Sequence, residues 1–151
     1  MDFVHVELKR DSWFAPAMVI TSPEDAVHFV KNMIRDRDRE TLVSIQVATS
    51  GRVINASICS VGTASYSLVP IPEILRTAIL SGANGIILIH NHPSGSVKAS
   101  KEDTDITKRL VFACQMMGIE LLDHIIIGEK DTFSFRKSDV DVFSIDHTLL
   151  K

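Results

Sequence analysis

The stretch GIILIHNHPSGSVKASKED, residues 85–103, decides the fold of this chain. It opens with an uninterrupted apolar run at 85–89, which predicts a central strand covered on both faces. A polar loop follows, and Ser100 then begins a helix that is expected to end near Met117. A buried strand that leads through a loop into a long helix is typical of a domain that packs helices against a sheet.

On both sides of this stretch, the periodicity of apolar residues predicts further strands and helices. Helices are expected from Ser22 and from Pro72, and strands at 3–8, 41–48, 52–61, 66–69, 119–127 and 132–135. This order predicts an α/β (α+β, three-layer) fold with a mixed β-sheet flanked by helices. The chain has neither a glycine-rich phosphate loop nor continuous βα alternation, so a nucleotide-binding Rossmann domain is disfavoured.

Length and composition fit one globular domain. The 151 residues can bury a core without staples, and we expect the domain at 20–137, an N-terminal arm with an edge strand at 1–19 and a C-terminal tail at 138–151. The net charge of −3 gives no general attraction for phosphate backbones, which disfavours non-specific DNA binding. Acidic and basic residues alternate at 35–40, and we interpret this run as a solvated turn.

Two features bear on the compartment. Cys59 and Cys114 are far apart, form no CxxC pair and lie in apolar surroundings, so we interpret both as buried thiols in a reducing environment. The start of the chain lacks the basic and apolar regions of a signal peptide, and no apolar run reaches the length of a membrane span. A cytoplasmic protein without membrane contact is expected.

Two histidines and an acid carry the chemistry of the decisive stretch. His90 and His92 are two residues apart at the end of a strand, so their imidazoles project to the same side. Asp103, in the first turn of the next helix, can bring its carboxylate to the same point. Two neutral imidazoles and one carboxylate suit Zn²⁺ and leave a fourth position open, which is the arrangement of catalytic zinc.

Each part of this pattern also has a purely structural interpretation. A histidine at a strand end is usually a satisfied polar group, and Ser100-x-x-Asp103 by itself is a capping box. The same three ligands would also suit a two-histidine, one-carboxylate iron site. The combination is much more specific than any one part.

The full spacing resembles a known motif. His90-x-His92-Pro93-x6-Ser100-x2-Asp103 is similar to the motif of the JAMM (MPN/JAB) metalloproteases. The run HNHPSG at 90–95 and the later pair Asp123 and His124 resemble the bacterial RadC-like branch of that group. The resemblance covers about residues 20–137.

The resemblance implies roles for individual residues. It implies a JAMM/MPN, cytidine-deaminase-like architecture with His90, His92 and Asp103 as zinc ligands. Ser100 matches the serine that hydrogen-bonds the oxyanion during amide or isopeptide hydrolysis. Asp123 and His124 match a motif without a clear role, either a contact to a metal ligand or, as we favour, a structural pair at the end of a buried strand.

The chain departs from the family pattern at the general base. Comparison with the RadC-like pattern places the expected glutamate at Ser57, and the strand at 52–61 carries no acid. Glu73 lies at a helix start, where the helix dipole favours an acid regardless of chemistry. The sequence leaves open that Glu73, Glu40 or a partner chain supplies a substitute base.

Three functions therefore compete. The first is a zinc metallohydrolase of peptide-type bonds, weakened by the missing base, with a protein or peptide as substrate. The second is an inactive zinc-binding module that recognises protein or nucleic acid. The family name suggests DNA repair, which the acidic charge does not support. The third is an iron site for oxygenase chemistry. Oligomeric state is not predicted.

Overall fold

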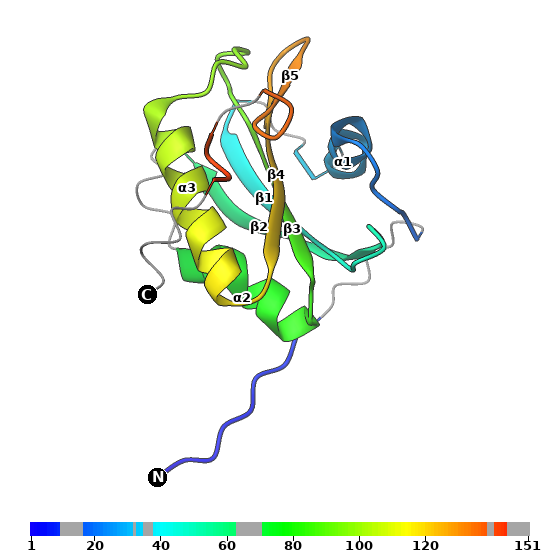
Figure 1. Ribbon diagram of the computed structural model, residues 1–151, viewed down its shortest axis with the longest axis vertical. Helices are drawn as coiled ribbons and strands as arrows, with labels where there is room; N and C mark the ends of the chain where they lie inside the picture. Colours follow the sequence, from blue (N-terminus) through cyan, green and yellow to red (C-terminus); the bar gives the residue numbers. More distant parts are fainter. Residues whose placement is uncertain (10–16, 32, 35–37, 63–70, 139–140, 145–151) are drawn as a thin grey trace.

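The computed structural model describes residues 1–9, 17–31, 33–34, 38–62, 71–138 and 141–144. Within them lie three helices and five strands (Figure 1). The helices are α1 (Pro23–Val30), α2 (Ile71–Ser81) and α3 (Lys101–Met116). The strands are β1 (Glu40–Val47), β2 (Val53–Gly62), β3 (Gly85–Asn91), β4 (Glu120–Ile127) and β5 (Thr132–Ser134).

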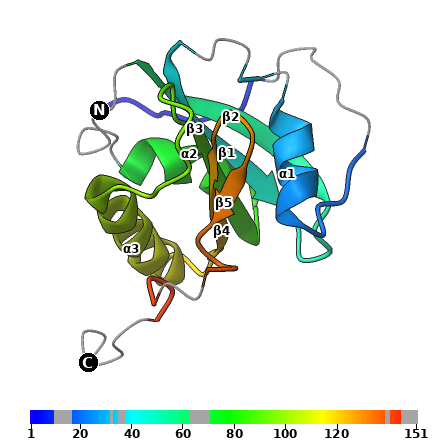
Figure 2. The same cartoon turned by 90° about the horizontal axis from the view of Figure 1, so that it is seen from above.

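The strands form one mixed sheet in the order β2-β1-β3-β4-β5. Only β3 and β4 run parallel, and α3 makes the crossover between them; the other neighbours are antiparallel. Helix α1 covers one face of the sheet, and α2 and α3 cover the other (Figure 2). The predicted three-layer fold with a mixed sheet is confirmed.

Strand β3 lies at the centre, and all seven of its residues are buried. Ile87 and Ile89 pack into the core under α1, whereas Ile86 and Leu88 pack into the core under α2 and α3. Because side chains alternate along a strand, His90 continues the row of Ile86 and Leu88. The histidine at the end of β3 therefore faces the layer that contains α3.

The predicted elements agree with the structure in most of the domain, with one correction. The expected strand at 3–8 is wrong, because residues 1–9 carry no strand and extend away from the domain (Figure 1). Alternating apolar residues form a strand only where a neighbouring backbone accepts their hydrogen bonds. The expected strand at 66–69 lies outside the described residues. No helix in the described ranges has the length and apolar character needed to cross a membrane.

Candidate metal centre

The pairing of β1 with β3 builds one side of the site. Leu42 lies opposite His90 in this antiparallel register. Beyond the last paired residues, Asn91 accepts a hydrogen bond from the Thr41 N–H at 2.8 Å and donates one to the Arg39 carbonyl at 2.9 Å. This amide bridge fixes the backbone on both sides of Glu40.

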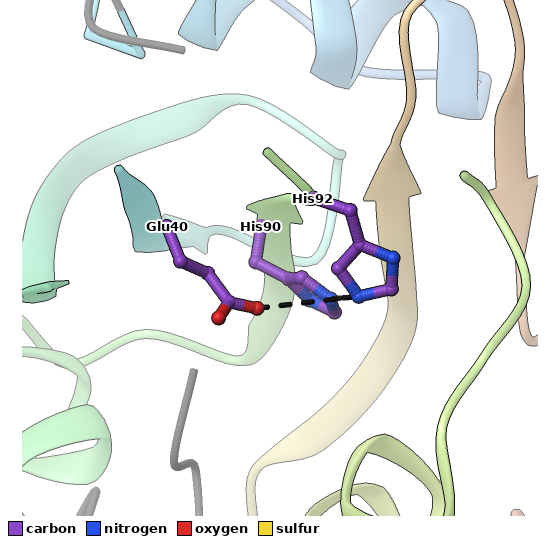
Figure 3. A group of neighbouring side chains, drawn as sticks. All are labelled: Glu40, His90 and His92. Atoms are coloured by element: carbon purple, nitrogen blue, oxygen red, sulfur yellow. Dashed lines mark hydrogen bonds and ion pairs between the residues drawn. The ribbon is translucent and has the colours of Figure 1, made fainter. Parts of the chain in front are cut away.

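Three polar side chains converge at the end of β3. The Nε2 atoms of His90 and His92 are 3.0 Å apart. Glu40 is buried at the start of β1, and its Oε1 lies 4.0 Å from Nε2 of His92 (Figure 3). Within the described part of the chain, these three residues offer ligand atoms that all lie within 4.8 Å of one another, so the group could hold a metal ion.

Asp103 approaches the same histidines from the first turn of α3. Its Oδ1 lies 3.3 Å from Nε2 of His90, and its Oδ2 lies 3.5 Å from Nε2 of His92. The residue is fully buried. The structure therefore brings together all three residues predicted as metal ligands, and it adds Glu40 beside them.

The two oxygens of Asp103 have different surroundings. Oδ2 accepts hydrogen bonds from the Ser100 N–H at 2.7 Å and the Ser100 hydroxyl at 2.6 Å, and Ser100 Oγ accepts from the Asp103 N–H. This is a complete capping box. Oδ1, by contrast, has no hydrogen-bond partner among the described residues. The cap and the ligand interpretations therefore hold together, because each uses a different oxygen.

The protonation of the histidines favours a cation. His92 Nδ1 lies 2.8 Å from the Ser96 carbonyl, which only accepts, so Nδ1 carries a proton and Nε2 is the nitrogen that points toward His90. Burial and the neighbouring His92 lower the pKa of His90 to about 3, so the His90 ring is neutral. The imidazole nitrogens and the buried carboxylate oxygen thus have too few protons to hydrogen-bond with one another, which favours a cation between them.

The spacing of these atoms suits zinc. Tetrahedral zinc with bonds of about 2.0–2.1 Å places neighbouring ligand atoms about 3.3 Å apart. The distances from His90 Nε2 to His92 Nε2 and to Asp103 Oδ1 are 3.0 and 3.3 Å. The donor set and its distances therefore fit a divalent cation of the zinc type.

The structure does not place Ser57, the expected position of the general base, beside the histidines. Ser57 pairs with Ser44 on β1, which pairs in turn with Leu88 on β3. Two strand spacings, about 10 Å, separate it from β3. The acid that reaches the site is Glu40, at the end of the charged run that we interpreted as a solvated turn.

Glu73, the other acid weighed as a base, engages elsewhere. It forms a bidentate ion pair with Arg76 on α2, with both distances at 2.8 Å, and its side chain is partly exposed. Its position in the first turn of α2 agrees with the dipole interpretation. Glu73 therefore acts at the solvent-facing first turn of α2.

Asp123 and His124 have separate roles. Asp123 accepts hydrogen bonds from the backbone N–H groups of His124 and Arg136 and from the Ser134 hydroxyl, which ties β4 to β5 and to the residues after it. His124 contacts His90, with its Nε2 2.9 Å from His90 Nδ1. The structural interpretation fits the acid, whereas the histidine contacts a predicted ligand.

A sheet covered by helices on both faces, with two histidines after its central strand and an acid at the next helix start, defines a JAB-type domain with a possible metal centre. The family profile described as the RadC-like JAB domain matches residues 20–140. The chain belongs to this RadC-like JAB domain family.

Curated relatives support the same family. A UPF0758 protein of Desulfitobacterium hafniense is 42% identical over 122 residues, which is 81% of this chain and 54% of the relative. One of Rubrobacter xylanophilus is 44% identical over 111 residues, 74% of this chain and 49% of the relative. One of Chlorobaculum tepidum is 37% identical over 146 residues, 95% of this chain and 62% of the relative. The chain spans about half the length of the relatives it matches.

Proposed function

We propose that the chain is a zinc-dependent metallohydrolase domain that cleaves peptide-type amide bonds, with His90, His92 and Asp103 as the zinc ligands. The observation that carries the proposal is the convergence of two imidazole nitrogens and a buried carboxylate oxygen: His90 Nε2 lies 3.0 Å from His92 Nε2 and 3.3 Å from Asp103 Oδ1, which has no hydrogen-bond partner among the described residues. Bound zinc supplies a Lewis acid that polarises a carbonyl and lowers the pKa of water.

Glu40 is the general base in this proposal. Its carboxylate lies near the same nitrogens but farther out, at 4.0 Å from His92 Nε2, so it can accept a proton from an attacking water without itself being a ligand. Asn91 holds the backbone around it through two hydrogen bonds. A positioned base of this kind contributes about 10² to 10⁴ in rate.

Ser100 is proposed to donate its hydroxyl proton to the oxyanion of the tetrahedral intermediate. In the present geometry that proton goes to Asp103 Oδ2 at 2.6 Å. Donation to substrate therefore requires the hydroxyl to turn away from Oδ2, which keeps its bond from the Ser100 N–H. The same serine thus supports the ligand before it contacts the substrate.

The position of Glu40 weakens the alternative that the chain is an inactive zinc-binding module. That alternative depended on the absence of an acid at Ser57, and Glu40 now stands beside the histidines. We therefore favour hydrolysis of a protein or peptide in a reducing, cytoplasmic compartment, which agrees with two free cysteines. Nucleic-acid recognition and a DNA-repair role gain no support from the net charge of −3.

The test is cleavage of an internally quenched peptide library by protein stripped with chelator and reloaded with zinc. We expect turnover that disappears with the chelator, returns with zinc, and falls in the Glu40→Gln variant. The Ser57→Ala variant is the matched control and keeps its rate. If the wild-type protein binds zinc with full affinity but cleaves no peptide, the inactive zinc-binding module is favoured.

A further inference from the structure

A chain of buried hydrogen bonds connects the predicted ligand His90 to the start of α3. His90 Nδ1 lies 2.9 Å from His124 Nε2, and His124 Nδ1 lies 2.6 Å from the Thr107 hydroxyl. Thr107 donates to the Asp103 carbonyl at 2.5 Å. The chain begins at one predicted ligand and ends on the backbone of another.

The number of available protons fixes which atom donates and which accepts in each of these hydrogen bonds. A carbonyl only accepts, so the single hydroxyl proton of Thr107 goes to Asp103. The Thr107 oxygen must then accept from His124 Nδ1, which carries the ring proton. His124 is only 1% exposed, so a charged ring would be poorly solvated; the neutral ring, with its proton on Nδ1, has a lone pair at Nε2. His90 Nδ1 must therefore donate, and His90 Nε2 is left as a lone pair toward the site.

The surroundings leave these residues little freedom to rearrange. Thr107, His124 and His90 are each at most 1% exposed, so water does not compensate a lost bond. The His124 ring stacks on Phe135, with centroids 5.0 Å apart and planes 9° apart. The backbone N–H of His124 is held by Asp123 at 2.8 Å.

The two predicted histidine ligands are thus fixed by different partners. His92 Nδ1 donates to the Ser96 carbonyl in the loop after β3. His90 Nδ1 instead contacts a second histidine, His124, whose own ring contacts the hydroxyl of Thr107. A neutral histidine can donate or accept at either nitrogen, and the Thr107 hydroxyl, whose proton goes to the Asp103 carbonyl, sets the direction of the His124–His90 contact.

We propose that Thr107 and His124 are positioning residues that hold His90 in its Nδ1–H tautomer, so that its Nε2 is presented as a metal donor. The metal part of this inference rests on the proposed function, whereas the tautomer part does not. Groups that orient metal-bound histidines in this way commonly change metal affinity by about 10- to 100-fold.

The experiment compares three substitutions in α3. Thr107→Val removes the hydroxyl that directs His124, and Thr107→Ser keeps it. Thr104→Val is the matched control, because the Thr104 hydroxyl also donates to a helix carbonyl, that of Ser100, at 3.1 Å but touches no histidine. Two measurements are made on each full chain: the ¹⁵N NMR tautomers of His90 and His124 without metal, and the zinc dissociation constant by chelator competition.

In the wild type, Thr107→Ser and Thr104→Val proteins, we expect both histidines as Nδ1–H tautomers. Thr107→Val is expected to show His90 in mixed or Nε2–H form and to bind zinc about 10-fold more weakly. An Nε2–H His90 in the wild type would overturn the inference, as would equal zinc affinity in Thr107→Val and Thr104→Val.

Failure of the proposed function gives a different result. If the wild-type protein shows the expected tautomers but binds no zinc, the metal centre is contradicted while the role of Thr107 and His124 in fixing His90 stands. The NMR measurement on wild-type protein also tests the inference if a variant does not fold.

Discussion

Glu40 faces His92 across the end of the β1–β3 pairing, with the Glu40 carboxylate 4.0 Å from the His92 ring nitrogen. The antiparallel register of β1 and β3 explains this placement. Leu42 lies opposite His90, and Glu40 and His92 each lie two residues beyond this pair, at the same end of the two strands. Glu40, 52 positions before His92 in the sequence, thereby joins the predicted metal centre.

Replacing Glu40 tests its role as the base. Glu40→Gln keeps the size of the side chain and removes its ability to take a proton, so we expect kcat to fall about 10²- to 10⁴-fold with zinc affinity changed little. Steady-state cleavage of the quenched peptides and chelator competition measure the two effects.

A loss of zinc affinity as large as the loss of kcat would instead make Glu40 a metal ligand. Ser57→Glu gives a complementary check. Because Ser57 lies two strands from β3, adding an acid there is not expected to raise turnover.

Asp103→Asn is expected to abolish the stabilisation that zinc confers. An amide oxygen is a poor zinc ligand compared with a carboxylate, whereas zinc at 100 times its dissociation constant should stabilise the wild type by about 2.7 kcal/mol. Thermal unfolding with and without zinc measures this shift. The control is Asp25→Asn, since Asp25 has the same capping-box position in α1. A full zinc-induced shift in Asp103→Asn would remove Asp103 from the ligand set.

The two capping serines separate stability from metal binding. Ser22 and Ser100 form the same capping box on α1 and α3. Loss of an N-cap costs about 1 kcal/mol, so Ser22→Ala and Ser100→Ala should lower the free energy of unfolding similarly. Only Ser100→Ala is expected to weaken zinc binding, because the Ser100 hydroxyl holds Asp103 Oδ2 at 2.6 Å. Urea denaturation and chelator competition provide the comparison, and equal zinc affinity in both variants would contradict it.

The cysteines are expected to be unreactive in the folded protein. Burial raises the pKa of Cys59 to about 11 and that of Cys114 to about 12. The unfolded thiols titrate near 8.5, so below that pH the folded state loses nothing, and its stability falls as the pH rises toward 11. Cys114 is buried as predicted, whereas Cys59 is only partly buried. Alkylation at pH 8, followed by mass spectrometry, should be slow until denaturant is added; rapid labelling of the native protein would contradict these values.

The part of the site that the sequence predicts is the part that is local. His90, His92 and Asp103 lie within 14 residues, and strand alternation with a capped helix start is enough to bring them together. Glu40 could not be found this way, since its position depends on which residues of β1 and β3 face each other. The Asn91 bridge that fixes this register is a long-range contact.

The same reasoning explains the other differences. His124 reaches His90 through the parallel pairing of β3 and β4, which contains an irregularity between Ile86 and Ile87 that no sequence period reveals. The apolar alternation at 3–8 resembles a strand, but these residues do not pair with any described strand. The periodicity of the sequence predicts which face of a strand or helix a residue occupies, whereas the tertiary fold determines which other residues it contacts.

The most direct measurement is anomalous diffraction at the zinc edge from crystals of the zinc-loaded protein. We expect one peak about 2.0–2.2 Å from His90 Nε2, His92 Nε2 and the Asp103 carboxylate, with the Glu40 carboxylate near the metal but not bound to it. A zinc-loaded crystal without a peak between the two imidazoles, or with a peak whose coordination excludes Asp103, would contradict it.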